Sequence, residues 1–261
     1  MGLTIALFQM NIAWCDIKAN LAKAEKYIRT ADADLVVLPE TFTTGFKTTS
    51  AEYAETMDGD TVKWFKDTAV STGKAIIGST MIKVPGQNGR DIFYNRLFFS
   101  TPDGTLLHYD KRHLFSFGGE AVHFSRGKER VIIEYKGFRI LPLICYDLRF
   151  PVWSRGRDEF DLMIYVASWD NSRIGVWDTL LRARAIENQS YVIGVNRVGK
   201  DPTANYEGHS VAVNYYGELL AAVEDENESD VIIELELEPL RRFRNKFRAW
   251  EDGDDFIIIV R

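Results

Sequence analysis

Three residues of contrasting chemistry each come shortly after an apolar run in the sequence. They are Glu40 after residues 35–38, Lys111 after residues 106–109, and Cys145 after residues 140–144. A carboxylate can accept the proton of a thiol, a thiolate can attack a carbonyl carbon, and an ammonium can stabilise the oxyanion that results. Because ligand sites of α/β sheets form beyond the carboxyl ends of strands, the three residues could form one site for nucleophilic catalysis.

Each of the three residues also has an ordinary structural explanation. Free cysteine is among the most buried residue types, so Cys145 alone fits a small core residue. Glu40 could be a helix or loop carboxylate, and Lys111 a solvated lysine in a basic turn. One local feature favours chemistry: Pro151 suits the first turn of a helix. Cys145 would then lie at a strand-to-helix turn, where the helix dipole lowers the pKa of a thiol.

The elements that must position these residues alternate between strands and helices. Apolar runs predict strands at residues 4–8, 35–38, 75–81, 92–99, 106–109, 140–144, 162–167, 191–195, 211–213 and 219–223, and a last central strand at 231–237. Helical spacing predicts helices after an Asp16 cap, from an Asp60 cap to Gly73, at residues 177–189, and from Pro239 to about Phe247. Two sheets packed face to face, with helices on their outer sides, would bury these strands in one domain over residues 1–261.

Bulk composition excludes several classes of protein. The net charge is -6, with 32 basic and 38 acidic residues, which argues against nucleic acid or an anionic membrane as the main partner. The two cysteines, Cys15 and Cys145, form no disulfide framework, and the four histidines lack the spacing of a metal site. No secretory signal or membrane-spanning run is found, so we expect a cytoplasmic protein.

Four motifs occur in a fixed order along the chain. They are Leu38-Pro-Glu40, Tyr109-Asp-Lys-Arg-His-Leu-Phe115, Cys145-Tyr-Asp-Leu-Arg-Phe-Pro151 and Arg182-Ala-Arg-Ala-Ile-Glu-Asn-Gln189. Together they resemble the carbon–nitrogen hydrolase (nitrilase) superfamily, from residue 3 to about residue 255. The cysteine motif and Lys246-Phe-Arg-Ala-Trp250 look like the ω-amidase branch, especially the bacterial 2-oxoglutaramate amidases.

The resemblance implies an α/β fold, a four-layer α-β-β-α sandwich, with a Glu–Lys–Cys triad formed by Glu40, Lys111 and Cys145. It also implies that Glu120 supports the lysine and orients the substrate. Members use no metal or organic cofactor. They pair as homodimers through the helix after the nucleophile and the C-terminal segment, about residues 239–261 here. The family resemblance implies hydrolysis of a small 2-oxo acid monoamide, 2-oxoglutaramate or 2-oxosuccinamate, through a cysteine thioester, with the Tyr146 backbone N–H as a second oxyanion donor.

A 2-oxo acid substrate requires a positive group for its far carboxylate, and an arginine suits it best. Arg112, Arg149 and Arg173 are the candidates. For Arg149 we favour a structural role, paired with Asp147 or a neighbouring helix. Phe117 and Trp169 could form the pocket wall, although aromatic residues near strand ends are more often core.

Other functions fit the same pattern. Within the superfamily the alternatives are an N-carbamoyl amino acid amidohydrolase and another aliphatic amidase or nitrilase. From a different class, the chain could be a catalytically silent binding module on the same scaffold. His113 is expected to hydrogen-bond locally rather than act as a base, and Cys15 to pack in its loop.

Overall fold

The computed structural model describes residues 2–47, 51–86 and 89–260. Its strands are β1 Gly2–Gln9, β2 Leu35–Val37, β3 Ala75–Pro85, β4 Asp91–Ser100, β5 Leu106–Asp110, β6 Ile133–Tyr135, β7 Phe138–Ile144, β8 Leu162–Ala167, β9 Tyr191–Asn196, β10 Val198–Lys200, β11 Asn205–Glu207, β12 Val211–Val213, β13 Leu219–Ala222 and β14 Ser229–Glu236. Its α-helices are α1 Ile17–Thr30, α2 Asp60–Thr72, α3 Glu120–His123, α4 Ile174–Asn188 and α5 Leu237–Lys246. None of the helices in this described part of the chain is long and apolar enough to cross a membrane.

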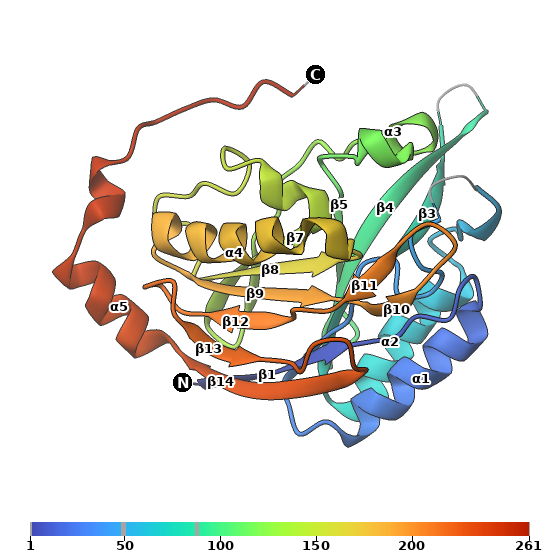
Figure 1. Cartoon of the computed structure of the whole chain (residues 1–261), viewed down its shortest axis with the longest axis horizontal. Coiled ribbons are helices and arrows are strands. Elements are labelled where there is room, and N and C mark those ends of the chain that lie inside the picture. Colours follow the sequence, from blue (N-terminus) through green and yellow to red (C-terminus); the bar gives the residue numbers. More distant parts are fainter. Residues whose placement is uncertain (1, 48–50, 87–88, 261) are drawn as a thin grey trace.

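Twelve of the strands form two six-stranded mixed sheets, and β10 and β11 pair as a separate antiparallel hairpin (Figure 1). The first has the order β14-β1-β2-β3-β4-β5 and the second β13-β12-β9-β8-β7-β6. In each sheet three neighbouring strands run parallel, β1-β2-β3 in the first and β7-β8-β9 in the second. The carboxyl ends of these central strands therefore carry the loops from which a site can be built.

The two sheets share one apolar core and carry helices on their outer faces. Ile5 and Ile77 of the first sheet belong to the same buried cluster as Leu141 and Ile193 of the second. A separate cluster joins the outer face of the first sheet to α1 and α2. The helix α4 covers the second sheet close to Gly194, where a Cβ atom would lie 2.6 Å from Leu181. The predicted α/β sandwich is confirmed.

Most of the predicted elements are confirmed to within a few residues, and Asp16 caps α1 by accepting a hydrogen bond from the Ala19 N–H. The predicted cap of α2 is wrong, because Gly59 holds the cap position and Asp60 is the first helical residue. The prediction of a central strand at residues 231–237 is also wrong. That strand is β14, which lies at the edge of its sheet and alternates between exposed residues and residues that are half-buried or, at Leu235, buried.

The helix predicted to start at Pro151 is absent from the described structure. Residues 145–149 form a single 3-10 turn, and residues 151–154 continue as further turns. The backbone of Phe150 leaves the helical region, with φ -114° and ψ 89°, so the 3-10 turn ends at Arg149.

Candidate active site

A buried lysine lies between two buried glutamates at one end of the sandwich. Lys111 Nζ is 2.7 Å from Glu40 Oε1 and 2.9 Å from Glu120 Oε2. All three side chains are essentially sealed from solvent. A buried charge is tolerated only when it is paired and hydrogen-bonded, so the two carboxylates and the ammonium hold one another in place.

Further donors fix the direction of the Glu40 carboxylate. The Asn95 side-chain amide donates to Glu40 Oε1 at 2.8 Å and to Glu120 Oε1 at 3.2 Å. The Ser168 backbone N–H donates to Glu40 Oε2 at 2.8 Å. Because Ser168 follows β8 and Glu40 follows β2, the carboxylate bridges the two sheets.

Cys145 is the first residue of the 3-10 turn that follows β7. Its φ is +44°, in the left-handed region that side chains other than glycine rarely adopt. Holding a residue in this conformation costs on the order of 1–3 kcal/mol, so it persists only where the surrounding structure fixes it. The side chain is buried, yet it still reaches the wall of a cavity.

The predicted lowering of the thiol pKa is wrong for the resting protein. Burial raises the pKa of Cys145 well above its usual range, and the negative charge of Glu40 raises it further, while Lys111 opposes both. The turn after Cys145 is too short to supply a helix dipole. The thiol is therefore protonated at rest, and a base must remove its proton before it can attack.

The pKa values of the two other buried groups are also shifted. Burial alone would lower the pKa of Lys111, but the charges of Glu120 and Glu40 outweigh it and raise that pKa. Burial raises the pKa of Glu120, although Lys111 opposes the shift. An ammonium that stays charged beside a protonated thiol suits the stabilisation of an oxyanion.

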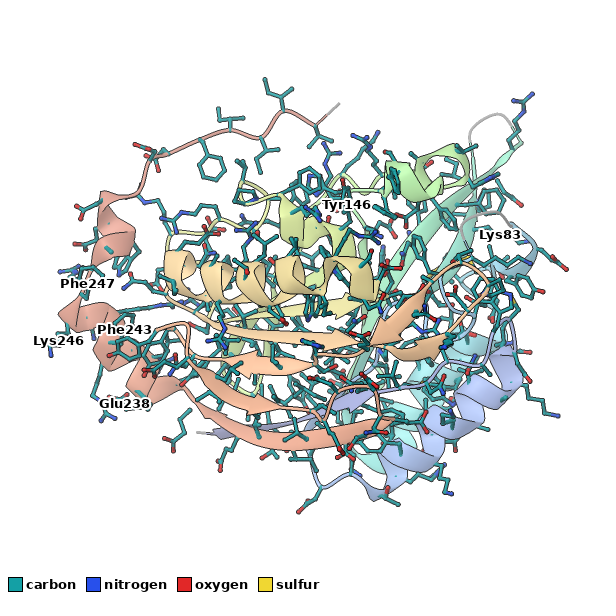
Figure 2. The ribbon with its side chains drawn as sticks, in the orientation of Figure 1. Lys83, Tyr146, Glu238, Phe243, Lys246 and Phe247 are labelled. Carbon is teal, nitrogen blue, oxygen red and sulfur yellow. The ribbon has the colours of Figure 1, made fainter. Side chains whose placement is uncertain are left out.

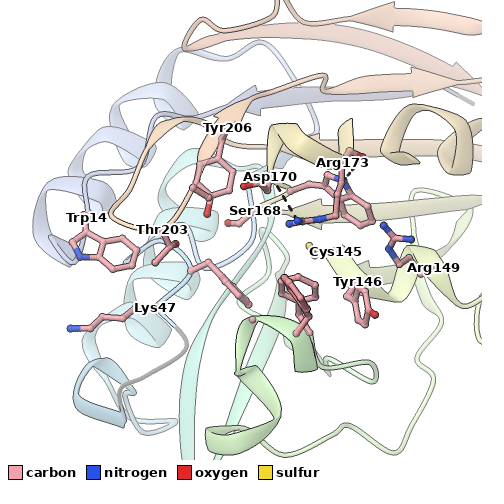
Figure 3. A pocket seen from close by; sticks show the side chains of 16 residues that line it. Trp14, Lys47, Cys145, Tyr146, Arg149, Ser168, Asp170, Arg173, Thr203 and Tyr206 are labelled. Carbon is pink, nitrogen blue, oxygen red and sulfur yellow. Dashed lines mark hydrogen bonds and ion pairs between the residues drawn. The ribbon is translucent and has the colours of Figure 1, made fainter. Parts of the chain in front are cut away.

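A cavity of about 400 Å³ opens in front of Cys145 (Figure 3). It is lined by Trp14, Phe46, Lys47, Phe115, Phe117, Gly118, Cys145, Tyr146, Arg149, Ser168, Trp169, Asp170, Arg173, Thr203, Ala204 and Tyr206. The lining is aromatic on most sides but includes three cationic side chains and one carboxylate. A volume of this size suits a small organic molecule, and the cationic groups favour an anionic one.

Of the residues predicted to contact the substrate, the structure brings Phe117, Trp169 and Arg173 to this cavity. Phe117 is 87% exposed at its rim, and Trp169 is buried in its wall. Arg173 lies over the Phe115 ring at 5.2 Å and forms a long ion pair of 3.8 Å with Asp170, drawn as a dashed line in Figure 3. The Tyr146 residue also lines the cavity, as its predicted role requires.

The favoured structural role of Arg149, paired with Asp147 or with a neighbouring helix, is wrong, because neither pairing is found among the described residues. Arg149 lines the cavity, with its guanidinium carbon 5.4 Å from the centre of the Trp169 ring. Asp147 instead accepts hydrogen bonds from Tyr109 and His113, both far along the chain. The sequence suggested the Arg149 pairing because the two residues are close along the chain, but the tight turn sends their side chains to different places.

Three other predicted residues lie outside the cavity lining. Arg112 is buried, donates to the Gly127 carbonyl at 3.2 Å and lies over the Trp153 ring, so it has a structural role. His113 hydrogen-bonds as expected, although its partner is Asp147. Cys15 is a half-buried free thiol in the loop after β1.

Sequence reasoning missed several residues of the site. Ser168 stands just beyond the carboxyl end of β8, so the rule that identified Glu40 and Cys145 would also have selected it. Asn95 is a buried amide in the middle of β4, where Asn95 and Arg96 interrupt a run of apolar residues, and this interruption was the available signal. No local signal marked Lys47, Thr203 or Tyr206, because a loop after β2 brings Lys47 to the cavity and the β10–β11 hairpin brings the other two.

Comparisons with known proteins agree with this arrangement. The family model described as carbon-nitrogen hydrolase matches residues 4–245. The Omega-amidase YafV of Yersinia enterocolitica is 43% identical over 259 residues, covering 98% of this chain and 99% of that protein. The 2-oxoglutaramate amidase of Bacillus subtilis (strain 168) is 32% identical over 258 residues, covering 97% and 98%. A CN-hydrolase superfamily protein from Xanthomonas campestris, crystallised with an arsenic adduct in the active site, superimposes with a TM-score of 0.94 at 40% identity and 99% coverage of both chains.

Proposed function

The chain belongs to the carbon–nitrogen hydrolase family, and from this premise we propose that it is an ω-amidase. It hydrolyses the terminal amide of a small 2-oxo acid monoamide, 2-oxoglutaramate or 2-oxosuccinamate, to the dicarboxylate and ammonia. The observation that carries the proposal is the sealed Glu40–Lys111–Glu120 cluster behind Cys145, at the inner end of a cavity with cationic walls. The full-length similarity to an ω-amidase and a 2-oxoglutaramate amidase supports the substrate class.

In the first half of the proposed reaction, Glu40 takes the proton of the Cys145 thiol, and the thiolate adds to the amide carbonyl carbon. The Lys111 ammonium and the Tyr146 backbone N–H stabilise the oxyanion that forms. Glu40 then returns its proton to the departing nitrogen, the C–N bond breaks, and ammonia leaves behind a thioester. Glu120 keeps the lysine charged and in place.

In the second half, a water molecule enters where ammonia left. Glu40 removes a proton from the water as its oxygen adds to the thioester carbonyl, and the same two donors stabilise the second oxyanion. The C–S bond then breaks and the thiolate of Cys145 recovers the proton from Glu40. No step of this proposed route needs a cofactor, since the chain's own residues move every proton.

The far carboxylate of the substrate needs a cationic partner within the cavity. Arg173 already forms an ion pair with Asp170. Arg149, in contrast, has no carboxylate within 4 Å among the residues that the structure describes. Arg149 also lies over the indole of Trp169, a cation–π contact that helps to hold its guanidinium in the cavity wall. Both arginines support binding of a 2-oxo acid. Arg149 is the better candidate, because its guanidinium is free to donate two hydrogen bonds to the substrate carboxylate.

A panel of substrates tests the proposal. Ammonia release would be measured with 2-oxoglutaramate, 2-oxosuccinamate, glutamine and carbamoyl-β-alanine, with a Cys145→Ala variant prepared in parallel to correct for contaminating amidases. Release from the two 2-oxo acid amides is expected. Carbon dioxide from carbamoyl-β-alanine would instead identify an N-carbamoyl amidohydrolase, and preferred turnover of neutral amides or nitriles would identify another branch.

Alkylation distinguishes an enzyme from a silent binding module on the same scaffold. Iodoacetamide should modify Cys145 stoichiometrically, and a 2-oxo dicarboxylate should suppress the modification by filling the cavity. A Cys145 that resists alkylation, in a protein that releases no ammonia from any amide of the panel, would favour the binding module.

We also propose that the protein forms a homodimer through α4 and the C-terminal residues 239–261. Phe247, Ile257 and Ile259 are 60%, 91% and 77% exposed, which leaves large apolar side chains without cover in one chain. Figure 2 shows Phe243 and Lys246 on α5, and Phe247 just after its end, at the rim of the molecule. Light scattering should give about twice the 29.9 kDa of one chain. A mass of one chain at micromolar concentration would contradict the dimer.

The cytosol is the compartment that we propose for this enzyme. A cysteine nucleophile must stay reduced, and both Cys15 and Cys145 are free thiols. Activity in the soluble fraction of fractionated cells, after spheroplasting has released the periplasm, would support this location. Activity confined to the released periplasm would contradict it.

A further inference from the structure

Asp147, two residues after Cys145, is a buried carboxylate that accepts four hydrogen bonds. Its Oδ2 accepts from the Tyr109 hydroxyl at 2.8 Å and from the Ile144 backbone N–H at 3.0 Å. Its Oδ1 accepts from the His113 backbone N–H at 2.9 Å and from His113 Nδ1 at 2.8 Å. Because each oxygen has two donors, the side chain has a single favourable orientation.

The four donors belong to two segments that come from different sheets. Tyr109 lies in β5 of the first sheet and His113 lies beyond its end, so the two residues flank Lys111 on either side. Ile144 ends β7 of the second sheet and directly precedes Cys145. One carboxylate therefore ties the segment that carries the lysine to the turn that carries the cysteine.

The turn that Asp147 supports is conformationally strained. Cys145 has φ +44°, and a strained residue of this kind persists only where its surroundings fix it. The Ile144 N–H donates a hydrogen bond to the Asp147 side chain and so links the two ends of this turn. The Trp153 indole extends the network by donating to the Tyr109 hydroxyl at 3.0 Å.

Asp147 does not act on the substrate directly. Neither Asp147 nor His113 is among the residues that line the cavity. A His–Asp pair near a cysteine could suggest a base of the protease type, but among the described residues no hydrogen bond joins the His113 ring to Cys145, and the ring is stacked on Phe150 with 3.8 Å between the ring centres. Asp147 and His113 therefore support the residues of the site without contacting the cavity.

We propose that Asp147 is a positioning residue that fixes Lys111 relative to Cys145, and so places the ammonium beside the oxyanion of the tetrahedral intermediate. This inference rests on the proposed thioester route, in which that oxyanion forms. A displacement of about 1 Å at a reacting centre can reduce turnover by about a hundredfold.

The test compares two reactions of the same cysteine in an Asp147→Asn variant. The asparagine keeps the shape of the side chain, but its NH₂ group faces two donors and breaks the network. We expect kcat for 2-oxoglutaramate to fall by about a hundredfold while KM changes by less than about threefold. Alkylation of Cys145 by iodoacetamide, read on its own peptide, should change by less than about threefold, because displacement at a saturated carbon forms no oxyanion.

Two further variants make the result decisive. Asp161→Asn also removes a buried carboxylate, one that binds Arg139 and Arg244, and it should lower the melting temperature without changing kcat per folded molecule. Tyr109→Phe deletes one donor and should lower kcat by about tenfold, and the double variant should be no slower than Asp147→Asn alone, because both changes break one network. If Asp147→Asn fails to fold, Tyr109→Phe carries the same comparison of kcat with alkylation.

The outcomes separate this inference from the proposed function. A folded Asp147→Asn variant with kcat within about threefold of the wild type would overturn the positioning role alone. Equal losses in turnover and alkylation would also overturn it, since they indicate general damage to the cysteine turn. A wild-type protein that releases no ammonia from any amide would refute both.

Discussion

Lys111 Nζ lies 2.7 Å from Oε1 of Glu40, and neither side chain reaches solvent. The contact joins the proposed base to the proposed oxyanion donor, so the two groups cannot move independently. Asn95 donates to the same carboxylate oxygen, and the Ser168 N–H occupies the other. The Glu40 carboxylate is therefore oriented before any substrate arrives, which is the preorganisation that a buried catalytic site requires.

Replacing the buried lysine should reduce both activity and stability. Lys111→Ala removes an oxyanion donor, which typically costs about a hundred- to a thousandfold in kcat. It also leaves Glu40 and Glu120 buried beside each other without their cation, at a cost of about 3–5 kcal/mol in the free energy of unfolding. Ammonia assays and urea unfolding measure the two effects, with the exposed Lys66→Ala as control. Near-full turnover of Lys111→Ala would exclude the proposed route.

Replacing the proposed base should make the Cys145 thiol easier to deprotonate, although the enzyme loses its activity. Burial raises the pKa of Cys145 and the charge of Glu40 raises it further, so Glu40→Gln should lower the thiol pKa relative to the wild type. Alkylation by iodoacetamide should then begin at a lower pH, although ammonia release is lost without the base. Mass spectrometry of the Cys145 peptide across pH measures the shift. A shift to higher pH would show that Glu40 does not face the thiol.

Serine in place of the nucleophile should remove activity while the fold is retained. Cys145→Ser changes one atom, but an alkoxide is much harder to generate than a thiolate, so ammonia release should be almost lost. The free energy of unfolding should stay within about 1 kcal/mol of the wild type. Cys15→Ser is the matched control and should retain turnover. Substantial activity in Cys145→Ser would indicate another nucleophile.

Removal of the Arg149 guanidinium should lower kcat/KM only for anionic substrates. A charge-assisted hydrogen bond contributes about 1.5–3 kcal/mol, so Arg149→Met should lower kcat/KM for 2-oxoglutaramate by roughly ten- to a hundredfold. The kcat/KM for butyramide, which lacks the carboxylate, should be unchanged. The exposed Arg241→Met serves as control. Equal losses for both amides would assign Arg149 to the structure of the cavity rather than to the carboxylate.

A buried aspartate far from the cavity should control acid stability. Burial tends to raise the pKa of Asp161, but Arg139 and Arg244 outweigh it and hold that pKa below its ordinary 3.8. A depressed carboxyl pKa stabilises the fold above the unfolded-state pKa, and the contribution disappears as pH falls through the folded-state pKa. Urea unfolding should show Asp161→Asn clearly less stable than the wild type at pH 7, with the difference shrinking below about pH 4. Asp67→Asn, an exposed change, should show no such trend.

The sequence by itself identified the candidate residues for the proposed chemistry. Apolar runs that end at Glu40, Lys111 and Cys145 placed all three near strand ends, and their motifs indicated the family. These features are local, because a buried strand and the turn after it are specified by neighbouring residues. The two-sheet architecture followed from the same pattern of strands and hairpins.

Only the tertiary structure decided how these groups act on one another. The raised pKa of Cys145 depends on burial and on Glu40, which lies about a hundred residues away in sequence. The place of Arg149 in the cavity, and the ties from Asp147 to Tyr109 and His113, likewise depend on two sheets meeting face to face. Electrostatic and hydrogen-bonding effects act over distances of a few ångströms in space. The folded chain sets those distances between residues that its linear order leaves far apart.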